Sequence, residues 1–68
     1  MPERLLNRLK ERRSELGLTQ AELAEKVGVT RKTVNTVENG VFTPSTTLAL
    51  KLARALDCRV EDIFFLVS

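Results

Sequence analysis

The stretch TQAELAEKVGVTRKTVNTVENG, from Thr19 to Gly40, contains the signals for two short helices separated by a break. Thr19 is followed three residues later by Glu22, a capping box that predicts a first helix beginning at Gln20. Gly28 is predicted to end this helix, because glycine adopts a positive φ without steric cost. The stretch therefore predicts a helix of about two turns that stops abruptly.

The second helix of this stretch has two unlike sides. Thr30 is its predicted N-cap, the helix is expected over residues 31–39, and Gly40 ends it. At about 100° per residue, Val34 and Val37 share one side. The other side, here called the polar face, covers an arc of about 140° and holds Arg31, Lys32, Asn35, Thr36 and Asn39. It contains no acidic and no large apolar residue, so its donors suit base edges and phosphates.

The break between these helices spans only three or four residues. We therefore expect the helices to cross steeply, so that the start of the second helix protrudes. A protruding helix of this kind fits a DNA major groove, which is about 12 Å wide.

The residues before Thr19 predict another helix, which ends at Leu16 and places Leu5 and Leu9 on one apolar stripe. Its start has two alternatives. The helix begins as early as Arg4, or Asn7 is the N-cap and the chain before it is extended.

The helix from Gln20 is expected to bury four residues, Ala21, Leu23, Ala24 and Val27.

Two further helices are predicted after residue 40. Ser45 is predicted to cap a longer helix with the apolar stripe Leu48, Leu52, Ala55 and Leu56. A last short helix is expected after Asp57, although Arg59 is a poor N-cap. The tail IFFLV is predicted as a strand or as an extension of that helix.

The composition predicts one small domain over residues 1–68 and argues against an enzyme. A chain of 68 residues buries only about 60% of its unfolded surface. It has no His and one Cys, so the commonest general base and the usual metal clusters are missing, and no cofactor is expected. Cys58 is expected to be a small buried apolar residue. No apolar run is long enough to span a membrane, and we expect a cytoplasmic protein.

Residues 20–40 resemble the helix-turn-helix of the Cro and phage-repressor family, also called the xenobiotic-response-element family. The matching residues are Gln20, Ala24, Gly28, Val34 and Val37, followed by the ending Glu38–Asn39–Gly40. The resemblance covers about residues 8–64. It implies an all-α fold of five helices with a helix-turn-helix at 20–39.

The resemblance also implies a role for individual residues. The base-contacting residues are expected to be Arg31, Lys32, Asn35 and Thr36. The phosphate-contacting residues are expected to be Gln20, Thr30, Thr33, Asn39, Thr43, Ser45 and Thr46. Arg13 and Glu38 match an internal ion pair. Arg31 and Lys32 replace the glutamines of several relatives, and since both favour guanine O6 and N7, a guanine is expected in each half-site.

The apolar tail over residues 63–68 is expected to complete the core or to form a dimer interface. The residues assigned to that interface are Phe64, Phe65, Leu66 and Val67. In some family members an N-terminal extended piece pairs with the C-terminal one, and the two ends of this chain are a candidate for the same small antiparallel sheet.

The sequence therefore predicts a transcriptional regulator that binds double-stranded DNA. The simplest form is a homodimeric repressor on a palindromic operator, without a small-molecule ligand. An alternative is the DNA-binding antitoxin of a toxin–antitoxin pair, whose tail contacts the toxin. On this basis Arg31→Ala should relax preference at one base pair, and Gln20→Ala should weaken all sites about equally.

Overall fold

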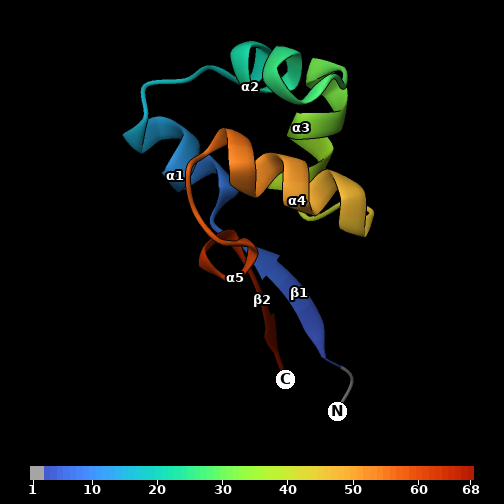
Figure 1. Cartoon of the computed structure of the whole chain (residues 1–68). Coiled ribbons are helices and arrows are strands. Elements are labelled where there is room, and N and C mark those ends of the chain that lie inside the picture. Colours follow the sequence, from blue (N-terminus) through green and yellow to red (C-terminus); the bar gives the residue numbers. More distant parts are fainter. Residues whose placement is uncertain (1–2) are drawn as a thin grey trace.

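The computed structural model describes residues 3–68. Its elements, in chain order, are β1 (Arg4–Asn7), α1 (Leu9–Glu15), α2 (Gln20–Val27), α3 (Arg31–Glu38), α4 (Thr46–Ala55), α5 (Val60–Ile63) and β2 (Phe64–Val67). The helices pack into one body, and the two strands extend from it as a two-stranded ribbon (Figure 1). The predicted five helices and the small terminal sheet are both confirmed.

Three side-chain caps fix the starts of the central helices. The Thr19 hydroxyl accepts a bond from the Glu22 N–H at 3.0 Å, and the Glu22 carboxylate accepts one from the Thr19 N–H at 2.8 Å. The Thr30 and Ser45 oxygens accept single cap bonds from the N–H groups of Thr33 and Leu48 at the starts of α3 and α4. The Thr19 N–H lowers the pKa of the Glu22 carboxyl. The stabilisation from the capping box is therefore fully present at pH values above the usual pKa of a glutamate. It is lost as the pH falls and Glu22 becomes protonated.

One apolar core joins all five helices. Its buried members are Leu9, Leu23, Ala24, Val27, Val34, Val37, Leu52, Ala53, Leu56, Ile63 and Phe64. The prediction that Ala21 is buried was wrong, because this residue is exposed. At about 100° per residue, Ala21 lies roughly 110° from the centre of the stripe that the other three residues form. Cys58 is half-buried against this core, and burial raises the pKa of its thiol.

Asn7 lies at the junction between the first strand and the first helix. Of the two alternatives the later start is confirmed, although the N-cap residue of α1 is Arg8 and not Asn7 as predicted. The Asn7 Oδ1 accepts a bond from the Leu9 N–H at 3.1 Å. The chain before it is strand β1, and the expectation that Leu5 shares a helical stripe with Leu9 was wrong. The same side chain also donates from Nδ2 to the Val37 carbonyl at 3.0 Å. Asn7 therefore links β1, α1 and the end of α3.

Replacing Asn7 by alanine is expected to lower the free energy of unfolding by about 1–3 kcal/mol, because two bonds to backbone groups are lost. Asn7→Asp keeps the acceptor for Leu9 but loses the donor to Val37, and it places a negative charge near the C-terminal end of α3. Aspartate should therefore fail to restore stability in urea unfolding followed by circular dichroism. Full recovery in Asn7→Asp would show that the bond to α3 contributes nothing.

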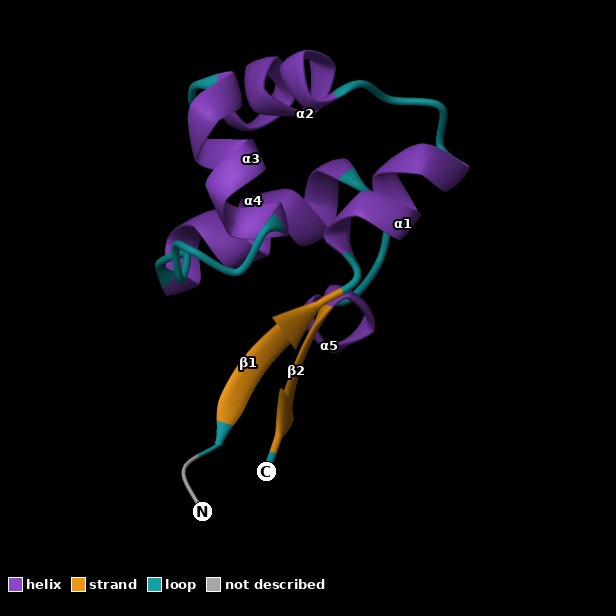
Figure 2. Cartoon of the chain, turned by 180° about the vertical axis from the view of Figure 1, so that it is seen from behind, coloured by secondary structure: helices purple, strands orange, loops and turns teal. Residues whose placement is uncertain are grey.

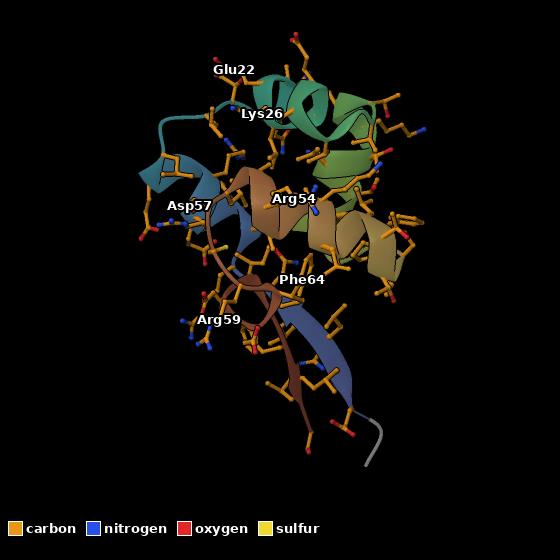
Figure 3. All side chains as sticks on the ribbon, in the orientation of Figure 1. Glu22, Lys26, Arg54, Asp57, Arg59 and Phe64 are labelled. Atoms are coloured by element: carbon orange, nitrogen blue, oxygen red, sulfur yellow. The ribbon has the colours of Figure 1, made fainter. Side chains whose placement is uncertain are left out.

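The two strands lie side by side (Figure 2). They pair antiparallel, with Leu5 opposite Leu66 and Leu6 opposite Phe65. Phe64 lies where β2 meets the helices, and it is only 7% exposed (Figure 3). Of the two roles expected for the tail, Phe64 takes the first, since its ring belongs to the core of the monomer. Leu66 differs, with 61% of its surface exposed.

The turn into α5 follows the expected local chemistry. Asp57 adopts a positive φ of 52°, a conformation that aspartate tolerates better than most residues. Arg59 precedes α5 and is not itself a side-chain cap; instead the Asp62 carboxylate accepts from the Arg59 N–H at 2.9 Å. Among residues 3–68, no helix is long and apolar enough to cross a membrane.

Candidate nucleic-acid interface

The polar face of α3 is presented by the packing of its two valines. Val34 and Val37 are 1% and 2% exposed, which orients α3 with its opposite side toward solvent. Gly28, with a φ of 75°, ends α2 in the left-handed conformation, and α3 then leaves α2 at a steep angle (Figure 1). The predicted helix-turn-helix geometry follows from this packing.

Four predicted contact residues meet on this surface. Arg31, Lys32 and Asn35 are exposed, and together with Gln20 from α2 they line one shallow hollow. Within residues 3–68, neither Arg31 nor Lys32 forms an ion pair. The first turn of α3 contains no acidic residue, so the positive end of the helix dipole adds to these two cations. The surface therefore suits an anionic ligand.

The hydroxyls of Thr30, Thr33 and Thr36 form hydrogen bonds at the start of α3 and within it. The Thr30 hydroxyl caps the helix and lies 3.1 Å from the Thr33 hydroxyl. Thr36 is half-buried, and its hydroxyl donates to the Thr33 carbonyl at 2.9 Å. These hydroxyls keep lone pairs as acceptors. The Thr36 proton is used within the helix, and one proton is used in the bond between Thr30 and Thr33. Thr36 accordingly lies at the edge of the polar face.

The predicted second phosphate site lies after α3. Thr43, Ser45 and Thr46 are exposed in the loop and at the start of α4. The Ser45 oxygen accepts the cap bond from Leu48, which leaves its hydroxyl proton available for a phosphate.

The ion pair predicted between Arg13 and Glu38 is present. Arg13 Nε and Nη2 lie 2.7 and 3.1 Å from the two carboxylate oxygens of Glu38, and Arg13 Nη1 donates to the Leu18 carbonyl. The side chains are 12% and 3% exposed, and the bond to Glu38 raises the pKa of Arg13. The pair fastens α1 to α3 and turns the only acidic residue of α3 away from the polar face.

Sequence reasoning missed two features of this region. Gln20 is predicted as a phosphate contact, yet its Nε2 also donates to Glu38 at 3.0 Å. Val41 and Phe42 follow α3 and are 78% and 47% exposed. Two adjacent apolar residues between Gly40 and a polar loop were an available signal for an exposed apolar surface.

The helix-turn-helix family model matches residues 9–63 of this chain. An HTH-type transcriptional regulator from Methanothermobacter thermautotrophicus, of uncharacterised role, is 56% identical over 59 residues, which cover 85% of this chain and 86% of the relative.

Two solved structures share the fold. The restriction-modification controller protein C.AhdI from Aeromonas hydrophila is 42% identical with a TM-score of 0.78, over 81% of this chain and 83% of that one. A protein from Bacteroides fragilis reaches a TM-score of 0.82 at 26% identity, over 90% of this chain and 98% of that one.

Proposed function

Because the chain belongs to the Cro-type helix-turn-helix family of DNA-binding transcriptional regulators, we propose that it represses transcription as a homodimer on a palindromic operator. The observation that supports operator recognition is the exposed polar face of α3. Arg31, Lys32 and Asn35 are exposed there, and the first turn of α3 contains no acidic residue. In this proposal they contact base edges, while Gln20, Asn39 and the loop around Thr43 contact phosphates.

A homodimer is supported by the energetics of recognition. One α3 contacts only a few base pairs, and each correct pair contributes about 1–3 kcal/mol. Two copies about 34 Å apart contact two half-sites on one side of the duplex and so require a palindrome. In this proposal repression acts by occupying the promoter.

The surface proposed for dimerisation lies on the ribbon. An isolated two-stranded sheet is marginally stable in water, so burying one face of this sheet would stabilise it. Leu66 is 61% exposed opposite the half-buried Leu5, and Leu5 lines a hollow together with Phe42. Phe65 and Val67 are half-buried, and by the alternation of strand residues they lie on the opposite face of the ribbon. A second copy would cover the face that carries Leu5 and Leu66.

Leu66→Lys should dissociate the homodimer, because a charge would be buried at the proposed interface. In sedimentation velocity the variant should be a monomer, and its operator affinity should fall at least about 100-fold as the second half-site is lost. Leu50→Lys is the matched control, since Leu50 is 54% exposed on α4. If Leu50→Lys dissociates the homodimer and Leu66→Lys does not, the interface lies on α4 and not on the ribbon. A wild-type monomer that assembles only with another protein would favour the antitoxin alternative.

A further inference from the structure

A chain of hydrogen bonds leads from the buried ion pair to the polar face of α3. Glu38 accepts from Arg13 and from Gln20 Nε2. Gln20 Oε1 accepts from Asn35 Nδ2 at 3.5 Å, and Asn35 Oδ1 accepts from Asn39 Nδ2 at 3.1 Å. The chain thus passes through three amides, of which the middle one is exposed beside Arg31 and Lys32.

Glu38 sets the direction of every bond in this chain. An ionised carboxylate only accepts hydrogen bonds, so Gln20 must turn its NH₂ group toward Glu38. The oxygen of Gln20 then lies on the side of Asn35, and Asn35 must present its own NH₂ group to it. The oxygen of Asn35 consequently faces Asn39. The two possible orientations of the Asn35 amide are thereby reduced to one.

This orientation leaves Asn35 with a defined set of free groups. An asparagine amide has two N–H donors and two acceptor lone pairs, and the chain uses one of each. One donor and one acceptor remain. In the major groove, adenine presents the N7 acceptor beside the N6 donor, whereas guanine presents two acceptors. The free groups of Asn35 match adenine.

We propose that Asn35 contacts an adenine in each half-site, and that Gln20 and Glu38 are positioning residues that hold its amide in the orientation this base requires. The inference rests on the proposed function. Gln20 keeps one N–H for a phosphate, so it serves both purposes. Its substitution should therefore change base preference as well as overall affinity, contrary to the uniform loss that the sequence alone predicts.

The test begins with selection of binding sites from random DNA by the full wild-type chain. Affinities are then measured for the selected site and for each single-base change, with wild type, Asn35→Ala, Gln20→Met and Thr43→Ala. Methionine keeps the length of Gln20 and removes its amide. Thr43 is an exposed predicted phosphate contact outside the chain of amides, so Thr43→Ala is the matched control. Circular dichroism melting confirms that each variant is folded.

Asn35→Ala should lower the preference for adenine by about 5–150-fold at one base pair of each half-site. Gln20→Met should lower it at the same base pair, and Thr43→Ala should leave it unchanged. Replacing that adenine by 7-deazaadenine, which lacks the N7 acceptor, should weaken wild type but not Asn35→Ala.

Two results would overturn the inference while leaving the proposed function intact. If Asn35→Ala keeps the preference for adenine, then Asn35 does not contact that base. If Gln20→Met weakens binding equally on all sequences, as Thr43→Ala is expected to do, then Gln20 does not position Asn35. Failure of the wild type to select any sequence would instead defeat the proposed function.

Discussion

Arg13→Met is expected to lower the free energy of unfolding by about 3–5 kcal/mol, because it leaves the Glu38 carboxylate buried without its cation. The Glu38 side chain is 3% exposed, so water cannot replace the lost partner. A domain of 68 residues has a total stability of about 3–10 kcal/mol at the usual 0.05–0.15 kcal/mol per residue. The expected loss is therefore about a third or more of the total stability, and the urea midpoint of the variant should fall by a similar fraction. Urea unfolding followed by far-ultraviolet circular dichroism measures the effect, as the chain has no Trp or Tyr for fluorescence.

The matched control for this prediction is the exposed pair between Arg12 and Glu15, at 3.3 Å in α1. Glu15→Ala should cost no more than about 0.5 kcal/mol, since surface ion pairs contribute little. In the double variant Arg13→Met, Glu38→Met the buried charge is gone, and much of the stability should return. Equal losses in Arg13→Met and Glu15→Ala would contradict the structural role of the buried pair.

Arg31→Ala is expected to weaken operator binding by about 2–6 kcal/mol in a homodimer, because each of two copies loses a base contact of about 1–3 kcal/mol. This corresponds to a loss from about 30-fold to more than 10⁴-fold. The loss should disappear on an operator whose contacted guanine is changed, where wild type and variant should bind alike. Fluorescence anisotropy with labelled operators at one fixed salt concentration measures both, since phosphate binding depends steeply on salt.

Arg54→Ala provides the control for this substitution. Arg54 is an exposed arginine on α4 rather than on the polar face of α3 (Figure 3). Its loss should leave the preference for guanine unchanged. If Arg54→Ala and Arg31→Ala reduce operator affinity equally on every sequence, then α3 does not provide the base contacts.

Local signals were enough to predict the elements of the helix-turn-helix. The caps at Thr19, Thr30 and Ser45 each act on a backbone N–H three residues ahead, and Gly28 acts through its own φ. Such interactions depend on neighbours in the chain, so they can be predicted without knowing the fold. The division of α3 into an apolar and a polar side is also local, because it follows from the spacing of its two valines.

The remaining features depend on partners far apart in the chain. The position of Leu5 in a strand requires the pairing of β1 with β2, whose residues lie about sixty positions later. Burial of Phe64 depends on where that ribbon joins the helices, and the donor and acceptor pattern of Asn35 depends on Glu38 through Gln20. No local pattern distinguishes these outcomes from their alternatives.

The sequence by itself determined the helices, their caps and the polar face of α3, because those depend on side chains within one or two turns of each other. Only the tertiary structure decided the terminal sheet, the place of Phe64 in the core and the orientation of the amides on α3. Each of these requires a hydrogen bond or an apolar contact between segments that only folding brings together.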